Sequence, residues 1–426
     1  MNFLKELKKN SEYNYFFIIF FSFLFLYTII FVVGIFLGKI PNYCVVDECM
    51  YFKNAINLSN GTYQNPLVDR LVAPMHSIYI GPIILLDLGR RAVVYLNLII
   101  SCLTISITYI TSRFYLSNKI SLIISILYGF YYVKFQTDFT ALTEPFTTFL
   151  VISYLFLVSQ YKLTKRKYFI ILSGITAGAL SLERPIFFYV TMFFLFISFF
   201  MYLKNKKYLN LFLSLILSFS LTLPYQIFTF KSTGKLFFFS NISAETVYWM
   251  SSPFQREYGD WNNENFDASC QSEFRKGINC NSKFLEENHG RFFESIKDLD
   301  MIQKNDALLK KGIENIKNYP VKYVRNIFSN ISRLFFNFPA SYMYQSDKTI
   351  LRILPNSLIL NLMIFSFFIT LINIKKFPKE MVFSISFTLI YLFLSSLITT
   401  QARMFVVVVP YILIWSAYSV KIWKKS

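Results

Sequence analysis

The chain has 426 residues, of which 54% are hydrophobic, 19% aromatic and only 16% charged, yet its formal net charge is +19. The 50 Phe against 13 Gly and 13 Pro exclude a disordered or fibrous protein. A mean hydropathy of +0.44 excludes an ordinary soluble domain, because no soluble core of this size could bury so much apolar surface. We therefore predict a protein that lies mostly within a bilayer. No basic stripe on a soluble module points to nucleic acid.

Apolar runs of about 20 residues predict about ten transmembrane helices, and thus an all-α polytopic membrane protein. The runs lie at 15–37, 92–110, 120–135, 141–160, 168–182, 185–203, 208–230, 353–374, 381–397 and 404–420. The run that starts at Tyr168 is short for a full crossing. The first run is too long and too aromatic for a signal peptide, so we expect a retained helix.

The distribution of Lys and Arg predicts the orientation. With the N-terminus inside, the short inner segments hold 18 of the 43 basic residues and three of the 24 acidic ones. The short outer turns hold little beyond Lys134, Arg184 and Arg403. Both termini are therefore expected in the cytoplasm, and most of the +19 is a signal of topology.

The predicted spans divide the chain into three parts. Residues 1–230 form a transmembrane core that includes a first outer segment at 39–91, residues 231–352 form a large outer region, and residues 353–426 form the last spans. An outer region of this length should contain packed elements of its own, and helical patterns occur at 284–299 and 307–336. No internal repeat is evident.

Four of the five cysteines lie in outer segments, whereas Cys102 lies within a span. Cys270 and Cys280 could form a disulfide in an oxidising compartment. Cys44 and Cys49 flank Asp47 and Glu48, and whether they pair is left open. No CxxC pair occurs and the chain has two His, so we expect no structural zinc site.

The start of the first outer segment predicts a short amphipathic helix at the membrane surface. Val45, Cys49, Phe52 and Ile56 would share one face, while Asp47, Tyr51 and Asn54 would share another. Such a helix holds two adjacent carboxylates one turn from a Tyr hydroxyl. The plainer reading is that Asp47 caps the helix and Glu48 favours its positive end.

Further ionisable residues recur at the predicted outer ends of the spans. Charged side chains near hydrocarbon are costly, so they usually face a cavity or a partner. We therefore expect an outward-facing polar site, and its members are Asp138, Glu144, Glu183, Arg184 and Arg403. Individually, Glu183 and Arg184 could be a surface pair, and Arg403 an interface anchor.

The residues Asp47-Glu48 followed by Tyr51, Ala55, Leu58, Gly61 and Tyr63 resemble the first-loop signature of GT-C glycosyltransferases. The resemblance is to the protein O-mannosyltransferase and lipid A aminoarabinose transferase branch. Four ordered elements extend it over roughly residues 10–420: Thr143-Glu144-Pro145-Phe146, Glu183-Arg184-Pro185, Asn318-Tyr319-Pro320-Val321-Lys322-Tyr323, and Arg403 followed by Pro410. The segment around His76 departs from the family pattern, because it lacks the expected Lys.

The resemblance implies a GT-C-like helical bundle with interfacial helices in the first outer segment. It also implies a hexosyl or pentosyl transfer from a polyprenyl-phosphate-linked donor, with inversion, at the extracytoplasmic face of a bacterial inner membrane. Acceptors would be a glycolipid, a polysaccharide or a protein of the cell envelope. By this resemblance Asp47 is the candidate base, with Glu48 orienting it or the acceptor. The substrate-binding candidates are Tyr51, His76, Asp138, Glu144, Arg184 and Arg403, the two arginines as phosphate clamps.

No cofactor is implied, and a divalent cation stays open: Asp47, Glu48 and Asp138 would hold one only if folding gathered them. Two other functions stay open as well. A polysaccharide polymerase or ligase would use Arg and His of the large outer region, where Arg256, Arg275, His289 and Arg291 occur. A lipid-linked sugar transporter or flippase should place ionisable residues at mid-bilayer and show repeated halves, and we find neither.

Overall fold

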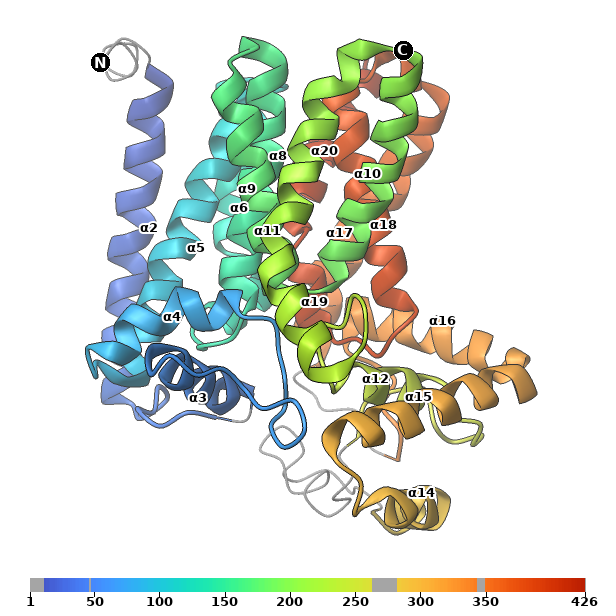
Figure 1. Cartoon of the computed structure of the whole chain (residues 1–426). Helices are drawn as coiled ribbons and strands as arrows, with labels where there is room; N and C mark the ends of the chain where they lie inside the picture. Colours follow the sequence, from blue (N-terminus) through green and yellow to red (C-terminus); the bar gives the residue numbers. More distant parts are fainter. Residues whose placement is uncertain (1–10, 46, 263–281, 343–348, 426) are drawn as a thin grey trace.

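The computed structural model describes residues 11–45, 47–262, 282–342 and 349–425, and every regular element within these ranges is helical (Figure 1). Seven of the described helices are long and apolar enough to cross a membrane. Helices suit a bilayer because they satisfy their backbone hydrogen bonds internally. The predicted all-α architecture is confirmed, and the chain is a polytopic integral membrane protein. The predicted pair Cys270–Cys280 lies outside the described residues.

The long helices stand side by side in one bundle (Figure 1). They are α2 (Ser11–Phe36), α5 (Gly89–Arg113), α8 (Glu144–Thr164), α10 (Ile186–Lys204), α11 (Leu209–Thr233), α17 (Ile350–Ile372) and α18 (Lys379–Ser396). Short 3-10 turns, η1 (Lys206–Tyr208) and η3 (Ile374–Lys376), precede α11 and follow α17. The Tyr27 hydroxyl of α2 donates a hydrogen bond to the Gly129 carbonyl (2.7 Å), which ties the first span to the bundle.

Three of the predicted spans consist of shorter helices that stand among the long ones. Residues 120–135 form α6 (Asn118–Gly129) and α7 (Tyr132–Asp138), 168–182 lie in α9 (Lys167–Glu183), and 404–420 divide into α19 (Ala402–Val406) and α20 (Val409–Trp423). At ~1.5 Å per residue, α6 is about 18 Å long, shorter than the ~30 Å hydrocarbon core. The segments 120–135 and 404–420 therefore differ from the prediction because each is divided into two helices, whereas α9 has the short length that the sequence indicated.

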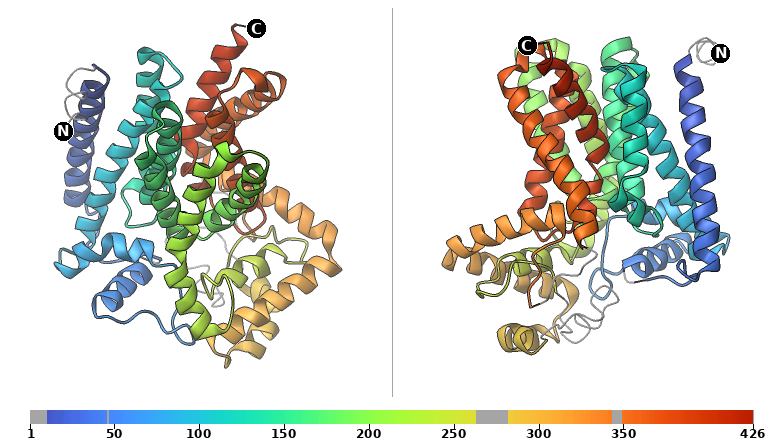
Figure 2. Two further views of the ribbon diagram at one scale, coloured as in Figure 1. Left: turned by 45° about the horizontal axis from the view of Figure 1, so that its top comes forward. Right: turned by 180° about the vertical axis from the view of Figure 1, so that it is seen from behind.

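Both termini lie at one end of the bundle, and the two long outer segments lie at the opposite end (Figures 1 and 2). This is the relative arrangement that the charge pattern predicts. The first segment contains α3 (Asp47–Ser59) and α4 (Met75–Leu85). The second contains α12 (Ser243–Met250), α14 (Ser282–Ile296), α15 (Met301–Asn318) and α16 (Pro320–Phe336). The helical pattern at 307–336 is divided by Pro320, which lacks a backbone N–H and begins a new helix.

The second outer segment has a small apolar core of its own, as its length led us to expect. Tyr248 and Trp249 of α12 pack with Leu285, Ile296 and Leu308 from α14 and α15. Because this core is separate from the core of the bundle, the outer helices are held by their own packing as well as by the membrane part.

A buried amide, that of Asn241, joins the two outer segments. The Nδ2 of Asn241 donates to the carbonyls of Pro66 (2.8 Å) and Asp69 (2.7 Å), and its Oδ1 accepts from the backbone N–H of Leu71 (2.8 Å). All three contacts lie on the stretch between α3 and α4. This amide therefore fixes the path of the first segment against the second.

Helices α9 and α11 approach closely where α9 has glycines, as small residues in packed membrane helices allow. A Cβ added to Gly174 would lie 2.6 Å from the carbonyl oxygen of Ser214. Beside it, the hydroxyls of Ser173 and Ser214 share a hydrogen bond of 2.9 Å. The close approach therefore depends on the missing side chain.

We expect Gly174→Ala to destabilise the protein by about 1–3 kcal/mol, because the added methyl group must push α11 away from α9. The measurement is the thermal unfolding midpoint of the purified protein in detergent. Gly81→Ala in α4 is the matched control, since a Cβ there meets no atom within 4 Å. Equal midpoints for the two variants would contradict this account of the packing.

Candidate functional site

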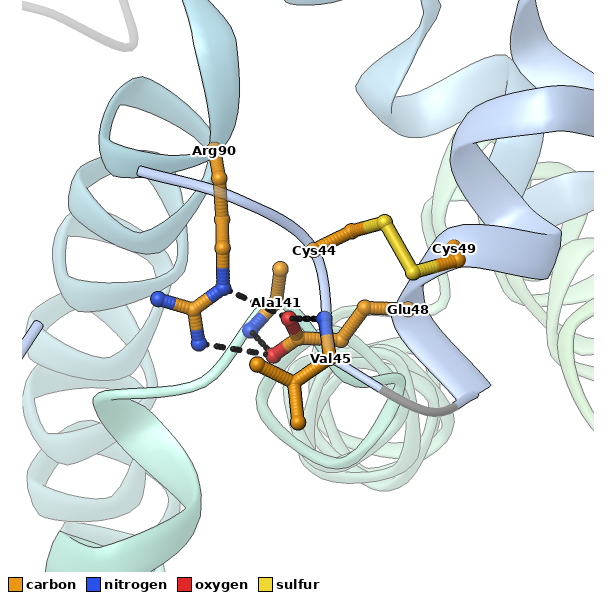
Figure 3. Close-up of a disulfide and its surroundings, with 6 residues drawn as sticks. All are labelled: Cys44, Val45, Glu48, Cys49, Arg90 and Ala141. Carbon is orange, nitrogen blue, oxygen red and sulfur yellow. Dashed lines mark hydrogen bonds and ion pairs between the residues drawn. A yellow bond between two sulfur atoms is a disulfide. The ribbon is translucent and has the colours of Figure 1, made fainter. Parts of the chain in front are cut away.

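The first outer segment begins with a covalent turn. Cys44 and Cys49 form a disulfide, which answers the question that the sequence left open (Figure 3). The bridge encloses the first turn of α3, and Asp47 and Glu48 lie within it. Carboxylates in the first turn are favoured by the positive end of the helix. The pairing therefore holds these two acidic residues in a defined turn.

Glu48 is buried at the centre of a set of N–H donors (Figure 3). Its Oε2 accepts from Nε of Arg90 (2.6 Å) and from the backbone N–H of Val45 (3.1 Å). Its Oε1 accepts from NH2 of Arg90 (2.9 Å) and from the backbone N–H of Ala141 (2.8 Å). We call this arrangement the Glu48 clamp. It joins the start of α3 to α5 and to the turn between α7 and α8.

Asp47 points the other way and begins a chain of ion pairs. NH2 of Arg403, in α19, donates to its Oδ2 at 3.0 Å, and Nε of Arg403 lies 3.5 Å from Oε1 of Glu144. The Asp47 side chain is 44% exposed and that of Arg403 26%, whereas Glu144 is buried. The chain therefore opens toward solvent at its Asp47 end.

The chain continues inward to Arg184, between α9 and α10. Its guanidinium is ion-paired with Oε1 of Glu144 and donates to the Thr143 hydroxyl (2.9 Å). Two carboxylates and two guanidiniums thus alternate, so their formal charges balance. The Oε2 atom of Glu144 is buried and has no hydrogen-bond partner among the described residues. An acceptor of this kind can bind a hydroxyl group.

The charges of both arginines are stabilised by these carboxylates. Burial alone would lower the pKa of Arg184, and Glu144 outweighs burial and holds that pKa above its ordinary value. For Arg403, burial is outweighed in the same way by Glu144 and Asp47. Burial and the nearby Asp47 raise the pKa of the Tyr51 hydroxyl. Tyr51 therefore stays a hydrogen-bond donor at neutral pH.

His76 lies beneath Tyr51, with ring centroids 4.7 Å apart. Its Nδ1 is 2.9 Å from Oε1 of Glu183, and its Nε2 is 3.3 Å from the Ala141 carbonyl oxygen. Both ring nitrogens therefore lie within hydrogen-bonding distance of an oxygen atom. His76 and Glu183 are buried, so they support the site from within.

The structure brings together most of the predicted site residues but not Asp138. Asp138 is buried and ion-paired with Lys134, and its Oδ2 accepts from the Ser101 hydroxyl (2.8 Å). The Lys134 ammonium also contacts the Tyr27 hydroxyl at 3.1 Å. This group sits between α2, α5 and α7, so Asp138 braces the bundle rather than extending the Asp47 chain. Over the described ranges, no three His, Cys, Asp or Glu side chains are grouped to hold a metal ion.

The predicted faces of α3 need correction. We expected Ile56 on the apolar face and Asn54 on the polar one, but Ile56 is exposed and Asn54 is buried with Glu48. The Glu48 clamp explains the burial of Glu48 at the start of α3, because it binds this carboxylate to Arg90 and to Ala141 of the bundle. Arg90 was missed by the sequence reasoning, since a basic residue at the start of a span is typical of an interface anchor. Thr143 was quoted only as part of a motif.

The large outer region contains a separate buried group of ionisable residues, formed by Glu257, His289 and Tyr248. Nε2 of His289 is 2.9 Å from Oε2 of Glu257, and its Nδ1 is 2.7 Å from the Tyr248 hydroxyl. Burial alone would raise the pKa of Glu257, but hydrogen bonds from His289, Ser252 and Asn288 outweigh it and hold that pKa below its usual range. His289 is itself buried under Trp249 and Phe254. This group therefore stabilises the outer core.

No family model matches the chain, and no curated protein matches it. Among solved structures, the chain is similar to the archaeal oligosaccharyltransferase AglB from Archaeoglobus fulgidus in complex with an inhibitory peptide and a dolichol-phosphate, with 14% identity and a TM-score of 0.45. The match covers 88% of this chain and 46% of that chain, so this chain spans less than half of that protein's length.

We expect Arg90→Gln to destabilise the protein by about 3–5 kcal/mol, because it leaves the buried Glu48 carboxylate without its charge partner. Lys53→Gln is the control. It breaks the ion pair of Lys53 with Asp69 in the same segment, where the Lys53 side chain is 65% exposed, and should cost about 0–1 kcal/mol. Unfolding midpoints in detergent measure both. Similar shifts in the two variants would show that the Glu48 clamp adds little.

Proposed function

We propose that the protein is a membrane glycosyltransferase that moves a sugar from a polyprenyl-phosphate-linked donor to an acceptor, at the end of the bundle opposite the termini. The observation that carries the proposal is the chain Asp47–Arg403–Glu144–Arg184. It sets a solvent-facing carboxylate beside two guanidiniums. In the amino-acid sequence these residues also occur in the order of the motifs that resemble GT-C enzymes. The seven apolar helices supply the bilayer location that a lipid-linked donor requires.

In the proposed reaction, Asp47 and the two arginines have different roles. An acceptor oxygen attacks the anomeric carbon of the sugar while Asp47 takes the proton from that oxygen. The bond between the anomeric carbon and the phosphate oxygen breaks, and the electron pair leaves with the lipid phosphate. Arg403 and Arg184 stabilise the phosphate, because guanidiniums bind such oxygens in a forked geometry. Attack from the face opposite the leaving group inverts the anomeric centre.

Donor binding would also prepare the base. In the structure, Arg403 donates to Asp47 at 3.0 Å, which occupies one carboxylate oxygen. A phosphate that draws the Arg403 guanidinium toward itself frees that oxygen for the acceptor proton. The Oε2 of Glu144 is buried and has no hydrogen-bond partner among the described residues, and we assign it to a hydroxyl of the sugar or the acceptor once the donor has displaced Arg403. Tyr51 would add a donor beside Asp47.

Glu48 has a positioning role in this proposal. Both of its oxygens already accept two N–H groups each, so it has little capacity left for substrate. Its place in the Glu48 clamp orients the turn that carries Asp47. His76 and Glu183 also have a positioning role. Glu183 contacts His76, and His76 contacts the Ala141 carbonyl and the ring of Tyr51.

We further propose that this end of the bundle faces the outside of a bacterial inner membrane. The cytoplasmic excess of Lys and Arg supports this orientation. The Cys44–Cys49 disulfide supports it as well, because disulfides persist in oxidising compartments. The burial of His289 disfavours a polymerase or ligase that would use this histidine, since its ring is enclosed by the outer core.

We expect Asp47→Asn to lower transfer by about 10²–10⁴-fold, because the amide cannot accept the acceptor proton. The assay uses purified full-length protein in lipid nanodiscs with polyprenyl-phosphate donors that carry different radiolabelled sugars. Released and transferred label is counted, which also separates an enzyme from a transporter. Lipid and glycan analysis of a deletion strain identifies the acceptor to supply.

Asp306→Asn is the matched control, because it makes the same chemical change in an exposed ion pair of the outer region. Its activity should equal that of the unaltered protein. Arg403→Lys should mainly raise KM for the donor, since a single ammonium replaces the forked guanidinium. Full activity of a correctly inserted Asp47→Asn variant would refute the assigned base.

A further inference from the structure

Helix α16 (Pro320–Phe336) lies across the outer end of the bundle, and its first half projects beyond it (Figures 1 and 2). The helix contacts α17, α18 and α19. The helix therefore runs at the level where the spans leave the membrane.

One side of α16 is used for contacts within the protein. Nδ2 of Asn326 donates to the carbonyls of Met250 and Ser252, both at 3.0 Å. Nδ2 of Asn330 donates to the carbonyl of Ser396 (2.9 Å), the last residue of α18. These asparagines are four residues apart, so they share one side of the helix. The same side is thereby fixed to the outer region and to the foot of the bundle.

The other side of α16 is apolar and exposed. Val321, Val324 and Phe328 are 66%, 49% and 68% exposed. They are three and four residues apart, so they also form one stripe. At 100° per residue this stripe lies opposite Asn326 and Asn330. The exposed Arg325 lies beside this stripe on the helix, whereas the Lys322 ammonium donates to the Glu257 carbonyl within the outer region. An exposed apolar stripe next to a basic residue is the pattern of a helix that lies in a membrane interface.

Continuity with the bundle identifies what covers this stripe. α17 starts beside the end of α16, and the Asn356 side chain donates to the Phe335 carbonyl. Leu351, Leu354 and Leu358 of α17 are exposed on a helix that is apolar enough to cross the membrane, so they face lipid. The apolar stripe of α16 extends from this lipid-facing surface at the outer end of the bundle.

We propose that α16 is an interfacial helix that binds the phospholipid surface of the outer leaflet. Val321, Val324 and Phe328 enter the boundary between headgroups and acyl chains. The exposed Arg325 lies at the level of the headgroup phosphates. The outer region is thereby held against the membrane through α16, as well as through its links to the bundle. This proposal is independent of the proposed enzymatic reaction.

Site-directed spin labelling tests the proposal on the full-length protein. Single cysteines replace Val324 and Phe328 in a background in which Cys102, Cys270 and Cys280 are serine and the Cys44–Cys49 disulfide is intact. The protein is placed in nanodiscs of phosphatidylethanolamine and phosphatidylglycerol. Collisions of the label with oxygen, which enters lipid, are compared with collisions with a water-soluble nickel chelate. Leu354→Cys is the lipid-facing reference. Lys310→Cys, at an exposed position of α15, is the aqueous reference.

The proposal predicts an oxygen-to-nickel ratio at 324 and 328 that exceeds the ratio at 310 by about threefold or more and approaches that at 354. A ratio equal to that at 310 would show that the stripe faces water and would overturn the proposal. Low accessibility to both reagents would show that a second copy covers the stripe, and would overturn it equally. The reference position 354 reports correct insertion in each preparation.

Discussion

The arrangement of the helices at the outer end depends on how one buried carboxylate, that of Glu48, is hydrogen-bonded and paired. A charge removed from water is costly unless it is paired and fully hydrogen-bonded, and Glu48 meets both conditions through Arg90 and two backbone N–H groups. The donors come from the loop before α3, from α5 and from the turn before α8. A single side chain thus couples three segments, and the geometry of Asp47 against Glu144 follows from that coupling.

Charge balance explains how so many ionisable groups coexist at a bilayer boundary. Arg403 and Arg184 alternate with Asp47 and Glu144, and Lys134 pairs with Asp138, so these three acidic groups each have a cationic neighbour. These pairs differ in exposure. Only the pair of Asp47 and Arg403 opens to solvent, and for this reason the proposed chemistry begins there.

Sequence patterns predicted the spans, the relative placement of the termini and the helix at Asp47, because hydrophobic length and charge bias are local properties. They also pointed to Arg184 and Arg403 through ordered motifs. They did not predict the partner of Glu48, since Arg90 is 42 residues away and resembles any basic residue at a membrane boundary. The buried face of α3 was missed for the same reason, because a tertiary ion pair overrides the hydrophobic pattern. Asp138 was assigned to the site because the sequence does not show that it is buried. In the structure it pairs with Lys134, one helical turn earlier, and both side chains are buried in the bundle.

The Cys44–Cys49 bridge also has a consequence for biogenesis. The two cysteines are five residues apart and directly follow the first span, so they can pair as soon as this short stretch reaches an oxidising compartment. At that moment α5 and α8, which supply the remaining donors to Glu48, are not yet in place. The first turn of α3 would therefore be set covalently before the bundle closes on it. In the orientation that we propose, assembly of this end would therefore follow its translocation.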